Sequence, residues 1–306
     1  MLLSFKFVVL PLIVAGFLGI SPFSIQTVPS APDKPPIHIR NQNACGLKDL
    51  KNPFTFAVIG DNRSGQETYK KLVSMIAKDA PAFVMNTGDV IMEGGDRSEW
   101  DEFATLSKPL TMPYFLTPGN HEIGNKVTEK AYKQCATNPG NDLYYSFTAG
   151  NALIVVLDSE ETGMHAKIVG EQYKWLKDQL KNSDSKFKFV FLHRPLYPAK
   201  WLHIVACMSK YRDKRDRLQA LFQKYGVDIV FAGHEHLYHR QEICGVTHVI
   251  TGGGGAPLYA TDAHGGFHHY VIGTVGEDKA EFKVIDVNGN IRDHFIISKK
   301  EKGNSI

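Results

Sequence analysis

The feature that most constrains this chain is a series of short apolar runs, each followed by a polar residue that can bind a metal ion. The runs are Phe54–Ile59, Ala82–Asn86, Tyr114–Leu116, Phe187–Leu192 and Val227–Phe231. Their β-branched and aromatic content is typical of strands that are buried on both faces. The polar residues that follow them are Asp61, Asp89, Asn120, His193, and the pair His234 and His236. A glycine directly precedes four of these positions, which allows a tight turn and a close approach of the backbone to an ion.

The positions of these residues favour one shared site. Asp61, Asp89 and Asn120 are separated by 28 and 31 residues, as in successive βα units. In open α/β sheets, ligands bind beyond the carboxyl ends of the strands. A single Gly-Asp pair is more often an ordinary turn, but five strand ends of this kind in the same phase are hard to explain as turns. Carboxylate, amide and imidazole groups together predict a metal centre.

Composition limits the class of protein. With 306 residues, 43% apolar and 22% charged, the chain has the makeup of an ordinary globular protein, long enough for one large α/β domain or two small ones. A formal charge of +3 is too small to indicate nucleic-acid or membrane binding. We therefore expect no nucleic-acid partner.

The N-terminus differs from the rest of the chain. Phe7–Ile20 carries no charge, and this run is shorter than the roughly 20 apolar residues that span a bilayer. Residues 1–24 are thus predicted to be a signal peptide or an uncleaved N-terminal anchor. Residues 25–50 read as a proline-rich linker, and residues 51–300 as the folded domain. The protein is expected to be secreted, extracytoplasmic or membrane-anchored, with membrane contact only through the N-terminal segment.

The four cysteines suit an exported protein. They are too widely spaced for a metal knuckle, and their even number suggests two disulfides. Three pairings are possible, and we favour Cys207 with Cys244 and Cys45 with Cys135.

The order of elements predicts an α/β fold whose last part is mostly antiparallel sheet. Helices are expected after Asp61, with Tyr69, Leu72, Val73 and Ile76 on one stripe, from the N-cap Ser98, over 171–181, and up to Tyr225. Further strands are expected at Leu143–Phe147, Ala152–Leu157, Val246–Thr251, His269–Val275, Glu281–Val287 and Ile291–Ile297.

The polar motifs together resemble those of the calcineurin-like metallophosphoesterase superfamily. They are Gly60-Asp61, Gly88-Asp89, Gly119-Asn120-His121-Glu122, His193 and Gly233-His234-Glu235-His236, and the resemblance extends from about Phe54 to the final strands. It implies a four-layer αββα sandwich of two mixed sheets flanked by helices. The last motif, continued to Arg240, is similar to that of purple acid phosphatases.

The resemblance also implies roles for these residues. Asp89 would bridge two metal ions, of which the second is also bound by Asn120, His193 and His234. The first ion would be bound by Asp61 and His236. His121 would be the general acid, with Glu122 as a possible partner that orients it. The ions would be divalent or trivalent, and Fe, Mn, Zn and Co all suit nitrogen and oxygen ligands.

Two residues depart from the family pattern. Arg63 stands where the first motif usually has a histidine ligand, and arginine cannot ligate a metal ion. The first ion is therefore bound weakly, completed by water, or absent. Arg63 itself either binds the substrate phosphate or points to solvent, and we favour the phosphate contact. Met92 stands where purple acid phosphatases have a tyrosine, so a purple Fe(III) centre is not expected.

The function that follows from the resemblance is hydrolysis of small phosphate esters by attack of a metal-bound hydroxide. Phosphomonoesters are preferred over diesters, because the sequence has no oligonucleotide groove of basic and aromatic residues. The alternative is a non-catalytic protein with a degenerate first metal site, which binds phosphorylated ligands or acts as a scaffold.

Overall fold

The computed structural model describes residues 44–136, 138–140, 143–199 and 206–299. The predicted signal peptide or anchor, and most of the predicted linker, lie outside these residues. Within the range predicted as linker, Ala44–Asp49 forms a 3₁₀ helix, η1, with a buried Leu47 whose carbonyl accepts a hydrogen bond from Gly150 N (2.9 Å). Within the described part of the chain, no helix is both long and apolar enough to cross a membrane.

Two six-stranded mixed sheets form the centre of the fold. The strands of sheet A are, in spatial order, β12 (Ile291–Ser298), β11 (Lys279–Asp286), β10 (His269–Val275), β1 (Phe54–Ile59), β2 (Phe83–Asn86) and β3 (Tyr114–Leu116). Strands β1, β2 and β3 are parallel, whereas β10, β11 and β12 continue the sheet in antiparallel fashion. Among the described residues, the last three strands therefore join the first one.

Sheet B has a parallel centre with an antiparallel strand at each edge. Its strands are, in spatial order, β4 (Tyr145–Ala149), β5 (Ala152–Val156), β6 (Phe187–Phe191), β7 (Ile229–Ala232), β9 (Val246–Thr251) and β8 (Tyr238–Ile243). Strands β5, β6, β7 and β9 are parallel. Strands β4 and β8 pair antiparallel with their neighbours.

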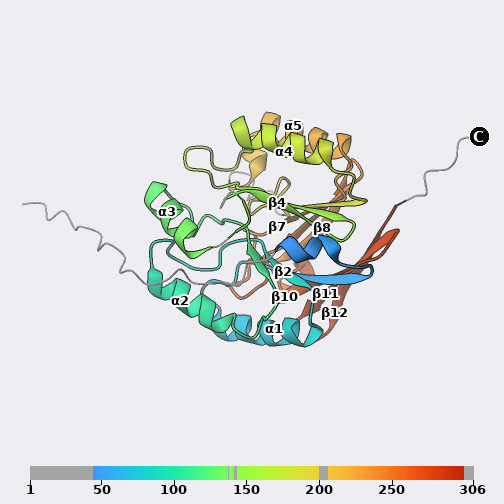
Figure 1. Ribbon diagram of the computed structural model, residues 1–306. Helices are drawn as coiled ribbons and strands as arrows, with labels where there is room; N and C mark the ends of the chain where they lie inside the picture. The colour runs from blue at the N-terminus through green and yellow to red at the C-terminus, as the bar shows by residue number, and fades with distance from the viewer. Residues whose placement is uncertain (1–43, 137, 141–142, 200–205, 300–306) are drawn as a thin grey trace, which may run out of the picture. The chain divides into compact units, whose positions relative to one another are not determined.

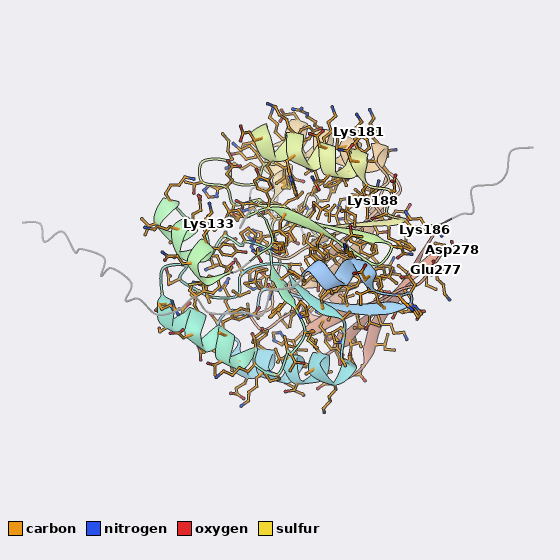
Figure 2. All side chains as sticks on the ribbon, viewed as in Figure 1. Lys133, Lys181, Lys186, Lys188, Glu277 and Asp278 are labelled. Carbon is orange, nitrogen blue, oxygen red and sulfur yellow. The ribbon has the colours of Figure 1, made fainter. Side chains whose placement is uncertain are left out.

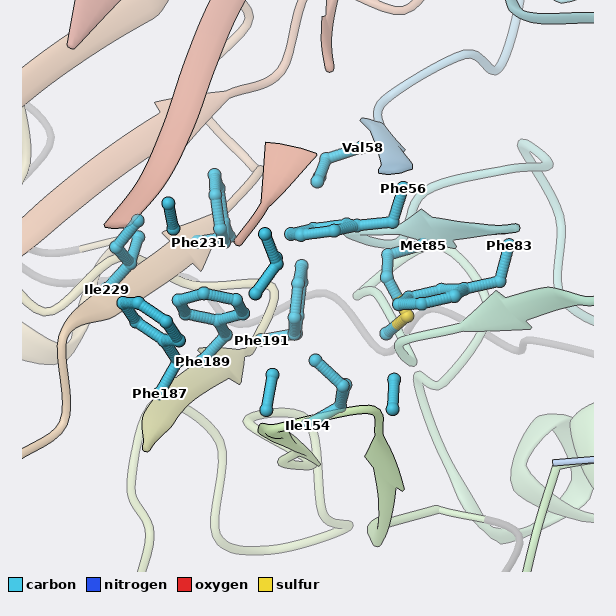
Figure 3. Close-up of a cluster of buried hydrophobic side chains, with 14 of the residues drawn as sticks. Phe56, Val58, Phe83, Met85, Ile154, Phe187, Phe189, Phe191, Ile229 and Phe231 are labelled. Carbon is cyan, nitrogen blue, oxygen red and sulfur yellow. The ribbon is translucent and has the colours of Figure 1, made fainter. Parts of the chain in front are cut away.

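The two sheets pack face to face through an aromatic core. Because successive side chains of a strand point to opposite faces, Phe56 and Val58 of β1 face the other sheet, while Ala57 and Ile59 face the helices. The Phe56 ring lies 5.2 Å from that of Phe83 in the same sheet and 5.7 Å from that of Phe189 in sheet B. Figure 3 shows these rings meeting between the strands. The core is thus shared by both sheets, which explains why their strands read as continuous apolar runs.

Helices cover the outer face of each sheet (Figure 1). Helices α1 (Gln66–Asp79), α2 (Arg97–Leu106) and α3 (Lys126–Cys135) share a buried cluster with sheet A. Helices α4 (Gly170–Asn182) and α5 (Arg212–Lys224) share another with sheet B. Two further 3₁₀ turns, η3 (Met208–Lys210) and η4 (Asp262–His264), lie in connecting segments. The predicted four-layer αββα sandwich is therefore confirmed.

At the strand ends opposite to the metal-ligand motifs, polar contacts also join the sheets. Lys186, which precedes β6, pairs with Asp278 in the β10–β11 turn, and Figure 2 shows the two side chains at the same edge. Asn151 Nδ2, before β5, donates to the carbonyl of Gly276 (2.9 Å). These contacts connect sheet A and sheet B where the apolar core ends.

Several local predictions were wrong. The N-cap of α2 is Asp96, whose carboxylate accepts from Ser98 N (2.8 Å), and not Ser98 itself. The predicted disulfides are not formed, because Cys135, Cys207 and Cys244 are free thiols. Cys135 is buried below sheet A and Cys207 is buried beside Glu235, whereas Cys244 is exposed in the β8–β9 turn.

Candidate metal centre

The polar residues that follow the five strands come together in one place. Two groups of side chains there are close enough to hold an ion, with ligand atoms within 4.8 Å of one another. The first group is Asp61, Asp89 and His236, and the second is Asp89, His193 and His234. Asp89 belongs to both groups. A carboxylate has two oxygens to share, so this residue could contact two neighbouring positions at once.

Three of these residues have an unusual backbone conformation. Asp61, Asp89 and His234 have φ angles of 56°, 56° and 70°, in the left-handed region that non-glycine residues seldom adopt. Such strain concentrates at functional sites, where the surrounding structure holds it in place. Here the left-handed conformation turns the chain sharply after β1, β2 and β7, so that the three side chains point to a common centre.

The neighbouring glycines make room for the carboxylates. A Cβ atom at Gly233 would lie 2.3 Å from Asp61 Oδ2, and one at Gly119 would lie 2.3 Å from Asp89 Oδ1. Both distances are far below van der Waals contact. The two glycines are therefore required by the close packing of backbone against carboxylate.

The second group has well-defined ligand atoms. His193 Nδ1 faces the carbonyl of Thr87 at 2.9 Å and, when protonated, donates to it. This leaves His193 Nε2 facing Asp89 Oδ1 at 3.3 Å, Asn120 Oδ1 at 3.1 Å and His234 Nδ1 at 3.3 Å. An imidazole held at one nitrogen by a backbone carbonyl is the usual arrangement of a metal-binding histidine. The four residues are fully or mostly buried and fit an ion of intermediate hardness.

The first group is arranged in the same way but includes a cation of the chain itself. His236 Nδ1 faces the carbonyl of Pro257 at 2.7 Å, and its Nε2 lies 3.5 Å from Asp61 Oδ1. Arg63 reaches the same place, with only 11% of its side chain exposed. Arg63 therefore does not point to solvent.

Burial and charge set the protonation of these groups. Burial and the nearby cationic groups lower the pKa of His234 well below its usual range, and burial lowers the pKa of His236 to about 4. Both imidazoles are thus neutral, as a metal ligand must be. Burial would lower the pKa of His193, but the Asp89 carboxylate outweighs it and raises this pKa to about 10. Metal binding at His193 therefore has to displace a proton.

His121 lies beside the same carboxylate. Its Nε2 is 3.9 Å from Asp89 Oδ2, and its Nδ1 faces the carbonyl of Met92 at 2.8 Å. The His121 side chain is 23% exposed, so its Nε2 is accessible to a molecule in the centre.

The described hydrogen bonds of the Glu122 side chain go to the backbone and not to the His121 ring, which faces the Met92 carbonyl and Asp89. The buried Glu122 carboxylate accepts four backbone N–H groups, those of Asp89 (2.9 Å), Val90 (2.8 Å), Ile91 (3.2 Å) and Gly119 (2.9 Å). It therefore fixes the loops after β2 and β3 against each other. Burial and the charge of Asp89 raise the pKa of Glu122 to about 7.

Sequence reasoning missed a second arginine at the centre. Arg194 Nη1 lies 3.4 Å from His234 Nε2, and its Nε donates to both oxygens of the buried Glu160 at 2.8 and 2.9 Å. Two signals pointed to this pair: Arg194 directly follows His193, and Glu160 lies in the polar segment that follows the apolar strand β5.

A cleft of about 1010 Å³ opens next to the centre. Tyr259 lines it and stacks on the His236 ring, with centroids 4.1 Å apart. Tyr238, Phe267 and Arg292 also line it. Because the Arg292 guanidinium is paired with Asp262 and Asp286, the cleft offers chiefly aromatic surface beside His236.

Comparisons with known proteins agree with this arrangement. A family model described as calcineurin-like phosphoesterase matches residues 54–238. Purple acid phosphatase 22 of Arabidopsis thaliana is 30% identical over 227 residues, which are 66% of this chain and 50% of that protein. The chain spans about half the length of the curated relatives that it matches.

Solved structures share the fold. A purple acid phosphatase from yellow lupin (Lupinus luteus) seeds has a TM-score of 0.69 at 22% identity, over 82% of this chain and 55% of that one. A dimetal phosphatase from Danio rerio has a TM-score of 0.59 at 17% identity, over 81% of this chain and 100% of that one.

Proposed function

The chain belongs to the calcineurin-like phosphoesterase family, and on this premise we propose that it is a metal-dependent enzyme that hydrolyses phosphate esters. One observation carries the proposal. Two groups of buried ligand atoms share Asp89, and the ring of His121 lies 3.9 Å from the same carboxylate. Ligands for an ion and a side chain able to transfer a proton are thus within reach of one bound phosphate.

The residues able to bind metal are Asp61, Asp89, Asn120, His193, His234 and His236. Their oxygen and nitrogen atoms suit Mn, Fe, Zn or Co. A bound cation would lower the pKa of a water molecule and polarise a phosphoryl oxygen. The residues themselves supply fixed geometry, because the Thr87 and Pro257 carbonyls hold the rings of His193 and His236.

Three further residues act on the substrate or its surroundings. His121 is the general acid: its Nδ1–H donates to the Met92 carbonyl, which leaves Nε2–H to protonate the leaving oxygen. Arg63 binds a phosphate oxygen through its planar guanidinium. Glu122 holds the loops that carry Asp89 and His121.

The substrate is proposed to be a small phosphomonoester. The adjoining cleft suits an organic group next to the phosphate, with Tyr259 and Phe267 available for apolar contact. Relatives named as phosphatases support the same choice over a diester. The uncharged run Phe7–Ile20 supports action outside the cytosol, as a secreted or membrane-anchored protein.

One observation favours a second candidate, a non-catalytic protein that binds phosphorylated ligands or acts as a scaffold. Arg63 occupies the position at which the family's first motif has a metal-binding histidine. A centre that had lost its metal in this way would keep its phosphate affinity without turnover.

The two candidates are separated by turnover with different leaving groups. The chain, Asp89→Asn, His121→Ala and the matched surface control His294→Ala would be assayed with nitrophenyl phosphate, bis-nitrophenyl phosphate and an alkyl phosphate, with and without added Mn²⁺. We expect metal-dependent monoester hydrolysis that is lost in Asp89→Asn and unchanged in His294→Ala. His121→Ala should lower kcat by about 10²–10⁴-fold for the alkyl ester, whose leaving group needs a proton, and by less for nitrophenyl phosphate.

Each other result has a clear meaning. Phosphate binding without turnover of any ester would favour the non-catalytic protein. Equal losses with all leaving groups would contradict the role of His121 as general acid.

A further inference from the structure

The two halves of the metal centre are not equivalent. In the second group, Asp89, Asn120 and His234 each place an atom within 3.3 Å of His193 Nε2, which makes four candidate ligands. Among the described residues, the first group has only Asp61, Asp89 and His236. The place of a fourth ligand in the first group is taken by a side chain that is always positively charged.

The guanidinium of Arg63 lies against the atoms that a first ion would use. Its Nε is 3.5 Å from Asp89 Oδ2, and its Nη2 is 3.5 Å from His236 Nε2. Because His236 Nδ1 faces a carbonyl, Nε2 carries the lone pair of this ring. Arginine has donors only and stays protonated. Its N–H groups therefore face the lone pairs of Asp89 Oδ2 and His236 Nε2, and its charge repels a cation at the same position.

Arg63 is held in this position by its surroundings. Its Nη1 contacts Met92 Sδ at 3.2 Å, and its backbone N–H donates to the carbonyl of Asp89 at 3.1 Å. The turn that follows Arg63 packs closely against a neighbouring loop, because a Cβ atom at Gly65 would lie only 2.0 Å from the carbonyl oxygen of Gly255. Met92 thus closes the outer side of the guanidinium, at the position where a purple acid phosphatase would have its tyrosine.

Arg63 also brings a fixed positive charge to a place lined by buried carboxylates. Its guanidinium pairs with Asp89, and Asp61 and Glu122 are buried beside the same residue. A second dication would sit against the guanidinium, which the buried surroundings would not screen.

We propose that Arg63 replaces the first cation, so that the centre holds a single metal ion, on Asp89, Asn120, His193 and His234. This inference rests on the proposed function, in that it takes the centre to be a metal site. The guanidinium supplies the charge of the first ion in binding phosphate, and it is held by Asp89 and His236, two residues that would otherwise bind that ion.

Metal content tests the proposal without reference to activity. The chain, Arg63→His, Arg63→Lys and the surface control Arg97→His would be loaded with Mn²⁺, dialysed, and analysed by elemental mass spectrometry and electron paramagnetic resonance. We expect one ion per chain in the unchanged protein, in Arg63→Lys and in Arg97→His. Arg63→His, which supplies the missing ligand and removes the charge, should bind twice as much metal. Two ions in this variant would share Asp89. The electron paramagnetic resonance spectrum of Arg63→His should therefore change from that of isolated Mn²⁺ to that of coupled Mn²⁺.

The possible failures are distinguishable. Two ions per chain in the unchanged protein would overturn the inference and leave the proposed function intact. A single ion per chain in Arg63→His would also overturn the inference, provided that an unchanged circular dichroism spectrum shows this variant to be folded. If Arg63→His does not fold, a coupled spectrum in Arg63→Lys would overturn the inference, and an isolated one would support it. No bound metal in any variant would contradict the proposed function itself.

Discussion

The four hydrogen bonds accepted by Glu122 allow a quantitative prediction. In Glu122→Gln one carboxylate oxygen becomes an NH₂ group, which faces two backbone N–H donors instead of accepting from them. If Oε2 is replaced, these are the donors of Asp89 and Gly119, both at 2.9 Å. Hydrogen bonds to charged groups contribute about 1.5–3 kcal/mol each, so losing two costs about 3–6 kcal/mol. Burial and repulsion by Asp89, which raise the pKa of Glu122 from 4.5 to about 7, disfavour the ionised carboxylate and offset about 3 kcal/mol of this, so we expect a net loss of up to about 3 kcal/mol.

Urea unfolding at a pH of about 8.5, in the presence of a chelator, measures this loss. At that pH the Glu122 carboxylate is ionised, since its pKa is about 7. Glu99→Gln is the matched control: Glu99 also accepts two backbone N–H groups, at 2.6 and 3.0 Å, but it is only partly buried. It should change the free energy of unfolding by less than about 1 kcal/mol. Equal effects of the two substitutions would refute the argument that burial makes Glu122 essential to the loops.

Three further predictions concern other parts of the fold. Phe56→Ala removes the ring between the sheets and should lower the free energy of unfolding by about 3–5 kcal/mol in chemical denaturation; a loss below 1 kcal/mol would mean that the core closes around the gap. Gly119→Ala places a methyl group 2.3 Å from Asp89 Oδ1 and should reduce metal content, whereas Gly124→Ala, with no described atom within 4 Å of its Cβ, should leave it unchanged. Burial raises the pKa of Asp158 to about 8 from an ordinary value of 3.8, so the native state favours the protonated carboxyl, and stability from this group is lost as the pH rises through that interval. The melting temperature of Asp158→Asn, relative to that of the unchanged chain, should therefore increase as the pH is raised from about 5 to about 8.5. A difference in melting temperature that does not depend on pH would contradict this.

The elements that the sequence predicts well are those with strong apolar periodicity. Strand β1 has the expected limits, and the four buried residues of α1 are the expected stripe of Tyr69, Leu72, Val73 and Ile76. By contrast, β8 was not predicted. Its residues Tyr238–Ile243 are polar and only partly buried, because β8 is an edge strand that gains its order from pairing with β9. An edge strand of this kind has no apolar signal of its own.

The candidate ligands were predictable because each follows a strand. Strands β1, β2 and β3 bring their residues from sheet A, and β6 and β7 from sheet B. The rule that ligands bind beyond the carboxyl ends of the strands was stated for a single open sheet. It still applied here, because both sheets direct these strand ends to the same place. The partners of the ligands were not predictable, because they depend on tertiary contacts. Glu122 binds loops and not a ring, and Glu160 reaches Arg194 from a loop 34 residues earlier in the chain.

The division of the candidate ligands between two sheets has a mechanical consequence. The described interface between the sheets is mostly hydrocarbon and aromatic, and such packing resists separation more than sliding. Coordination bonds are directional, so an ion held jointly by Asp89 of one sheet and His193 of the other would fix how far one layer can shift along its neighbour. Loading the centre should thus stiffen the whole sandwich, and amide exchange in β2 and β6 should slow even at residues that touch no ligand.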